Sequence, residues 1–296
     1  MRGLGNFTAK EWLRALPLQH AFKQVRNDAL LAIYKRIRPQ ALQSFLDETQ
    51  HLKGKNIALI IAFEQPWALA WQLRMIKQNL ADTTALVCDN SQRMAARAEV
   101  KRVCADNGVS YLALPKNPTH HVNRSHGMAL TWAFYNIVQE IQPSLFAFLD
   151  HDLIPIERVS LEERLGGKPF FGDAKISDGG WSLWAGYCMY DFAAVTDLPL
   201  NFLYDFSREL DTGGRNYRCL YRHYDWRELR LAASEFITTK DPLTGESRRI
   251  EMIDQSWFHM GGISYNDGFP GRFKFFEYLA QGLDEGKSWS VLVNGE

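Results

Sequence analysis

The chain has 296 residues, of which 46% are hydrophobic, and its 34 Lys and Arg residues balance 34 Asp and Glu residues. The resulting formal charge of zero argues against a general nucleic-acid-binding protein, which needs a basic surface to displace phosphate counterions. The apolar fraction excludes a disordered chain, and four widely separated cysteines favour free thiols in a reducing cytoplasm over a zinc ribbon or a disulfide framework.

Residues 1–54 predict a basic helical extension. Through Lys55, ten basic residues against four acidic ones leave this segment at +6, so the remainder carries −6. Phe22, Val25 and Ala29 recur at helical spacing. Two interpretations stay open: an amphipathic element that contacts the anionic inner face of a membrane, or a helical collar packed on its own domain, which is favoured because basic faces are usually solvated. With neither a signal peptide nor an apolar run long enough to cross a bilayer, we expect a cytoplasmic protein, with peripheral membrane attachment as the alternative.

Residues 55–296 predict a single α/β domain. Apolar runs bounded by turn residues alternate with helical patterns, which predicts a mostly parallel, Rossmann-like sheet flanked by helices. The second half is less regular and rich in aromatic residues, and we expect it to add loops and short strands to the same sheet. The expected strands are 56–63, 84–89, 109–114 and 145–149, and the expected helices are 67–80, 91–107 and 123–141.

Two carboxylates follow the strand expected at 145–149. Alternate side chains of an extended segment share a face, which predicts that Asp150 and Asp152 point to one side and His151 to the other. Two close carboxylates need a cation to offset their repulsion, and a hard divalent ion, Mg²⁺ or Mn²⁺, suits oxygen ligands while leaving positions open for phosphate. A lone D-x-D is a weak signal, but its position after a buried strand strengthens it.

Asp89 ends the second expected strand in the same way. Because the carboxyl ends of parallel strands meet at one edge of a sheet, we expect Asp89, Asp150 and Asp152 to converge there. The sequence contains neither a GxGxxG after the first strand nor a GxxxxGK[ST], which disfavours a Rossmann dehydrogenase and a P-loop NTPase. The remaining possibility is a nucleotide site built from acidic residues and a metal ion.

The order of elements over residues 56–152 and the D-x-D resemble glycosyltransferases of the GT-A fold, particularly the inverting family 2. The resemblance implies that Asp89 contacts the nucleotide base, that Asp150 contacts the ribose or the metal shell, and that Asp152 coordinates the metal bridging the diphosphate. Residues 123–127, Asn-Arg-Ser-His-Gly, look like the family's RNxG-type helix start in a different order. Arg124 is therefore either a phosphate or sugar ligand or a solvated residue at the helix start.

A sugar transfer that inverts configuration needs a base to deprotonate the acceptor hydroxyl, and a carboxylate is the usual choice. Asp211, on a glycine loop, is our first candidate, with Glu209 and Asp205 as rivals. His259 is similar to a late metal-binding histidine of some GT-A enzymes, although a buried structural histidine fits equally well.

Two further clusters are open to a structural reading. His120, His121, His126 and His151 lie close in the sequence, but the pair in the polar loop lacks paired ligand spacing, which favours loop residues. The aromatic residues Trp181, Trp184 and Tyr187 fit either a platform for a sugar acceptor or, with stronger support, the core.

The resemblance implies a metal-dependent transferase that moves a sugar from a nucleoside diphosphate sugar to a glycan or glycolipid acceptor, as in polysaccharide biosynthesis. Its partners are then the donor and the acceptor, with no nucleic acid. One alternative is a sugar-nucleotide nucleotidyltransferase, which normally carries a glycine-rich basic loop that residues 62–66 do not supply. The other is a catalytically inactive sugar-nucleotide binding protein, against which the intact acids Asp89, Asp150 and Asp152 count.

Overall fold

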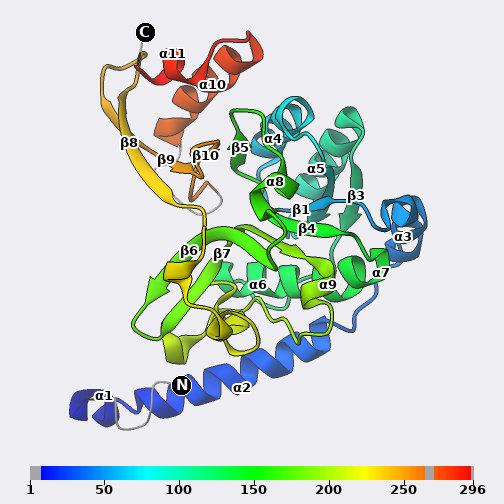
Figure 1. Cartoon of the computed structure of the whole chain (residues 1–296), viewed down its shortest axis with the longest axis vertical. Coiled ribbons are helices and arrows are strands. Elements are labelled where there is room, and N and C mark those ends of the chain that lie inside the picture. Colours follow the sequence, from blue (N-terminus) through cyan, green and yellow to red (C-terminus); the bar gives the residue numbers. More distant parts are fainter. Residues whose placement is uncertain (1–7, 264–269, 295–296) are drawn as a thin grey trace.

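A six-stranded sheet lies at the centre of the molecule, in a computed structural model that describes residues 8–263 and 270–294 (Figure 1). Its strand order is β3-β2-β1-β4-β7-β6. Four neighbouring strands are parallel, and β7 runs antiparallel to both strands beside it. The strands are β1 (Ile57–Ala62), β2 (Thr84–Asp89), β3 (Ser110–Ala113), β4 (Leu145–Asp150), β6 (Phe170–Ser177) and β7 (Gly180–Asp191). The mixed α/β fold with a mostly parallel, Rossmann-like sheet is therefore as predicted.

Helices cover both faces of this sheet, because both faces of its central strands are apolar. In β1, Ile57, Leu59 and Ile61 pack into a core cluster with the helix that precedes β4, whereas Ala58 and Ile60 join a second cluster with the helices that follow β1 and β2. The helices are α4 (Pro66–Asn79), α5 (Met94–Asn107), α6 (Val122–Ala133), the π-helical η3 (Phe134–Val138) and α7 (Gln139–Ile141).

A second, four-stranded sheet corrects the expectation that the second half only extends the first. β6 and β7 do join the central sheet, but the other strands pair in the order β5-β10-β9-β8. The sequence conceals this sheet because β5 pairs with a strand about a hundred residues later. Its elements are β5 (Leu153–Pro155), β8 (Ser234–Lys240), β9 (Ser247–Ile253) and β10 (Trp257–His259), packed with α10 (Pro270–Asp284) and α11 (Trp289–Asn294).

The predicted helical extension consists of α1 (Ala9–Leu13), α2 (Leu16–Tyr34), α3 (Leu42–Thr49) and the 3₁₀-helix η2 (Gln50–Leu52). Thr8 and Glu11 form a capping box at the start of α1. Leu42, Phe45 and Leu52 share a core cluster with the central sheet, so the second part of the extension is continuous with the domain core. A domain boundary at residue 54 stays a prediction.

The remaining segments are short. They comprise α8 (Leu161–Leu165), α9 (Phe192–Val195), η4 (Phe206–Arg208), η5 (Gly214–Arg218), η6 (Tyr221–His223) and η7 (Trp226–Glu228). Within residues 8–263 and 270–294, no helix combines the length and the apolar character needed to cross a lipid bilayer.

Tyr34 provides a test of how α2 is attached. Its side chain is fully buried, and its hydroxyl donates to the carbonyl of Pro115 at 3.1 Å. We expect Tyr34→Ala to lower the free energy of unfolding by about 3 to 5 kcal/mol, because it leaves a cavity and removes this bond. The neighbouring Ile33 is 65% exposed, so Ile33→Ala should change the free energy of unfolding by less than about 0.5 kcal/mol. Equal effects of the two substitutions in denaturant titrations would contradict this attachment.

Candidate functional site

A pocket of about 220 Å³ lies at the point where the strand order reverses. The chain passes from β1 to β2 and β3 on one side, and then places β4 on the other side of β1. Ligands of open α/β sheets bind in the crevice outside the carboxyl ends of the strands at such a point. Ile61 near the end of β1 and Asp150 at the end of β4 both line the pocket, so its position agrees with that rule.

Asp150 and Asp152 converge on this pocket, but through a turn and not through an extended segment. β4 ends at Asp150, residues 151–152 form a turn, and β5 begins at Leu153. His151 consequently also lines the pocket, which corrects the expectation that it points to the opposite side. The buried amide of Gln72 on α4 holds the turn by donating to the carbonyls of Asp150 at 2.6 Å and Leu153 at 2.8 Å.

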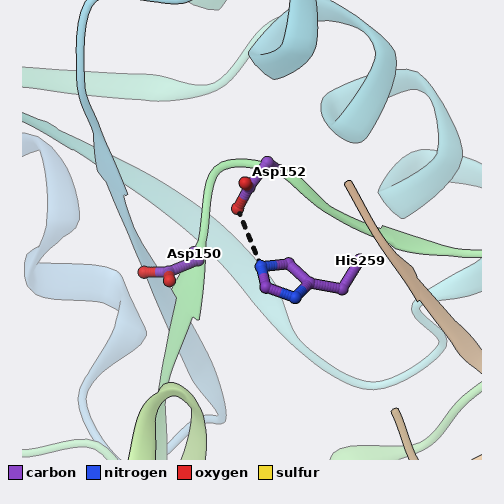
Figure 2. A group of neighbouring side chains, drawn as sticks. All are labelled: Asp150, Asp152 and His259. Atoms are coloured by element: carbon purple, nitrogen blue, oxygen red, sulfur yellow. Dashed lines mark ion pairs between the residues drawn. The ribbon is translucent and has the colours of Figure 1, made fainter. Parts of the chain in front are cut away.

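His259 completes a group of three possible ligands with these two carboxylates. One ligand atom from each of Asp150, Asp152 and His259 lies within 4.8 Å of the others. His259 stands on β10, opposite Leu153 of β5, and its Nε2 is 3.6 Å from Asp152 Oδ1 (Figure 2). Its Nδ1 is 2.6 Å from Glu251 Oε2, on the neighbouring strand β9. The second sheet therefore delivers the histidine to the edge of the first.

The electrostatics of His259 and Asp152 favour their charged forms despite their burial. Burial alone would lower the pKa of His259, but the carboxylates of Asp152 and Glu251 outweigh it and raise this pKa well above the usual range. Burial would raise the pKa of Asp152, but the charge and hydrogen bond of His259 lower it. When no metal ion is bound, protonated His259 is thus the positively charged partner of Asp152 and Glu251.

The donor set suits a divalent metal ion. Two carboxylates and an imidazole offer the oxygen and nitrogen ligands that Mn²⁺ accepts, and Mg²⁺ would rely more on the carboxylates. Glu251 orients the ring of His259 through Nδ1 and leaves Nε2 toward the carboxylates, the usual outer support of a metal-bound histidine. Gly186 on β7 leaves room for Asp150, since an added Cβ would lie 2.5 Å from Asp150 Oδ2. Asp150, Asp152 and His259 can therefore hold a metal ion.

Glu251 gives a direct test of this support. We expect Glu251→Gln to weaken Mn²⁺ binding by about 10 to 100-fold, because the neutral amide orients His259 less firmly and lowers its basicity. Glu246→Gln, at an exposed position of the same hairpin, should leave Mn²⁺ affinity unchanged. Calorimetric titration with MnCl₂ measures both variants, and equal affinities would remove Glu251 from the site.

Asp211 also lines the pocket, as the proposed base must. It is exposed, and its Oδ1 accepts from the amide of Asn123 at 2.8 Å, so the start of α6 orients it. Glu209 is outside the pocket lining, with a left-handed backbone (φ 58°). Asp205 is fully buried and paired with Arg218 at 2.7 Å. Among the three carboxylates considered as a base, Asp211 alone faces the pocket.

Arg124 and Asp89 do not line the pocket. Arg124 donates to Thr119 Oγ1 at 3.0 Å and thereby positions a residue that does line it. Asp89 is fully buried, and its carboxylate accepts from the backbone of Ser91 and from the hydroxyl of Tyr111, both at 2.9 Å. The structure therefore does not bring Asp89 together with Asp150 and Asp152.

Asn90 occupies the place that the sequence predicts for Asp89. It lines the pocket and donates to Ser125 Oγ at 3.0 Å, while Asn117 donates to the carbonyl of Ser125 at the same distance. These buried amides join the loops after β2 and β3 to the start of α6. Nothing in the sequence singles out Asn90 beyond its position directly after the strand.

His126 and Trp184 also line the pocket, although the sequence does not favour a ligand role for His126 and leaves the role of Trp184 open. His126 Nε2 lies 3.1 Å from Asp150 Oδ1, so this histidine contacts the candidate metal ligand directly. Trp184 lines the pocket with its ring centroid 4.7 Å from that of His259, whereas Trp181 and Tyr187 are buried core residues. The aromatic cluster is thus divided between core and pocket.

Comparisons with known proteins add little to this geometry. No protein-family model matches the sequence, and no curated protein matches it. Among solved structures, the chain is similar to the apo structure of WbbM, a bifunctional glycosyltransferase, with 11% identity and a TM-score of 0.32. The match covers 49% of this chain and 32% of WbbM. So distant a likeness carries no argument about function.

Proposed function

We propose that the protein is a metal-dependent glycosyltransferase of the GT-A type, similar to family 2. It transfers a sugar from a nucleoside diphosphate sugar to a hydroxyl of a glycan or glycolipid acceptor, with inversion of configuration. The observation that carries this proposal is the meeting of Asp150, Asp152 and His259 with Asp211 in one pocket at the switch point of the sheet. A metal-binding group and a separate exposed carboxylate are what a displacement at a sugar phosphate needs.

Each of these residues has a defined task in the proposed reaction. Asp150, Asp152 and His259 would hold Mn²⁺ or Mg²⁺, which supplies charge stabilisation for the departing diphosphate. Asp211 accepts the proton of the acceptor hydroxyl as the oxygen attacks the anomeric carbon. Asn123 keeps the Asp211 carboxylate oriented through its 2.8 Å hydrogen bond. The metal that meets the leaving group and the base are thus held by different residues of the same pocket.

Recognition of the nucleotide falls to the loops around the pocket. We assign the direct contacts to Asn90 and Gln92 after β2, both of which line it. Asp89 then acts indirectly, because its carboxylate fixes the backbone of Ser91 and so the shape of this loop. Arg124 acts in the same indirect way through Thr119. The flat ring of Trp184 offers a surface for a sugar face.

Donor cleavage in ¹⁸O-labelled water tests the reaction class. In the absence of an acceptor, we expect slow Mn²⁺-dependent hydrolysis of one sugar nucleotide from a panel, with ¹⁸O in the sugar and none in the nucleoside diphosphate, because the bond broken is that between C1 and oxygen. Label in a phosphate product would instead indicate attack at phosphorus, as for nucleotidyl transfer or pyrophosphate-bond hydrolysis. Donor binding without turnover, with or without candidate acceptors, would identify an inactive binding protein.

A further inference from the structure

The outward side of α2 is apolar. We call this surface the α2 outer face; its members are exposed and follow helical spacing. Four of them, the large residues, are 65% to 69% exposed. The members are Leu18, Ala21, Phe22, Val25, Ala29, Ala32 and Ile33. Within α2, the exposed residues outside this set are Gln19 and Asp28. A monomeric soluble protein rarely exposes so continuous an apolar strip unless the strip has a partner.

The opposite side of α2 is fixed to the body of the protein. Leu31 and Tyr34 are buried in the core cluster, and the buried Asn27 donates to the hydroxyl of Tyr204 at 3.1 Å. Asp28 forms an ion pair with Arg215 of η5. Figure 1 shows α2 along one margin of the molecule, at the far end from α10 and α11. The α2 outer face is therefore held in a fixed orientation, directed away from the core.

Positive charge brackets this apolar strip. Lys10 and Arg14 precede it, Arg36 and Arg38 follow it, and all four are exposed. Over residues 1–55, ten basic residues exceed four acidic ones by six. The acidic Asp28 at the edge of the strip is already paired with Arg215. Exposed Trp12 and Leu13 lie between Lys10 and Arg14 in the sequence.

We propose that the α2 outer face docks on the surface of an anionic lipid bilayer. The apolar side chains would enter the boundary between headgroups and acyl chains, and the four flanking bases would meet lipid phosphates. Charge disfavours a second copy of the chain as the occupant. In a parallel or an antiparallel pair of α2 helices, a basic end would face a basic end. This proposal does not depend on the reaction assigned to the pocket.

Vesicle sedimentation of the full chain tests the proposal. We expect binding to vesicles that contain phosphatidylglycerol, and binding about tenfold weaker to phosphatidylcholine alone or in high salt. The double variant Phe22→Glu/Val25→Glu should reduce the partition coefficient at least about tenfold. Leu243→Glu, an exposed apolar residue (57%) of the turn between β8 and β9, is the matched control and should bind like the parent.

A second variant and a second measurement make each outcome decisive. Arg36→Glu/Arg38→Glu changes exposed charges alone, should keep the parent's thermal midpoint, and should lose salt-sensitive binding. No binding of the parent to anionic vesicles, or parental binding by both double variants, would overturn the proposal. Light scattering tests whether a second copy of the chain covers the α2 outer face. If the parent is a dimer that does not bind vesicles, and Phe22→Glu/Val25→Glu dissociates this dimer, the face would be assigned to a second copy.

Discussion

Asp152→Ala is expected to abolish measurable Mn²⁺ binding, a loss of more than about 100-fold in affinity, which corresponds to about 3 kcal/mol. Asp152 is buried beside His259, and its side chain is one of the three candidate metal ligands, with Asp150 at the end of β4 and His259 on β10. Its removal leaves two ligands and returns His259 to a single acidic partner, Glu251. Titration calorimetry with MnCl₂ alone measures this loss without any knowledge of the donor.

The fold should survive this substitution. The turn is held by backbone contacts, because Gln72 donates to the carbonyls of Asp150 and Leu153 and the Met260 amide donates to the carbonyl of Asp152 at 3.0 Å. Asp178→Ala, which removes an exposed carboxylate outside the pocket lining, is the matched control and should bind Mn²⁺ like the parent. Parental Mn²⁺ affinity in folded Asp152→Ala would refute the metal site.

Asp211→Asn is expected to slow sugar transfer by about 10² to 10⁴-fold while nucleotide affinity stays unchanged. The amide keeps the size of the side chain but cannot accept the proton of the acceptor hydroxyl. Because Asp211 is not among the candidate metal ligands, donor binding should not depend on its charge. The rate of donor consumption under single-turnover conditions, together with calorimetric affinity for the nucleoside diphosphate, separates the two effects.

Glu209→Gln serves as the control on the same stretch, since Glu209 is exposed outside the pocket lining. It should transfer within about twofold of the parent. Asp205→Asn is a stability variant and not a control, because it would leave Arg218 without its buried partner. A selective rate loss in Glu209→Gln with a normal rate in Asp211→Asn would reverse our assignment; normal rates in both would place the base elsewhere.

The first half of the fold could be predicted from the sequence because its signals are local. The continuous apolar runs of β1 and β4 are bounded by turn residues, and the prediction for β2 matches its observed bounds, Thr84–Asp89. β7 escaped prediction because its twelve residues mix polar, aromatic and glycine positions. The pairing of β5 with β10 escaped it because strand pairing across so long a separation leaves no trace in local composition.

The candidate site was predictable where residues follow a strand and not where they act across sheets. Asp150 and Asp152 were identified by their place after β4, and His259 was identified by resemblance. Glu251 requires the register of β9 with β10, in which it stands opposite His259. Gln72 requires the packing of α4 against the turn. A strand-end acid need not line the pocket, as buried Asp89 illustrates, and the sequence cannot distinguish it from Asp150, which does line the pocket.

We propose that a divalent metal and a nucleoside diphosphate meet at the carboxyl edge between β1 and β4. Crystals grown with Mn²⁺ and a nucleoside diphosphate, measured for anomalous scattering of manganese, test it most directly. We predict an anomalous peak enclosed by Asp150, Asp152 and His259, with diphosphate density beside it in the pocket, and we predict its loss in Asp152→Ala crystals. Manganese bound elsewhere, with these three side chains paired only among themselves and with Glu251, would contradict the account.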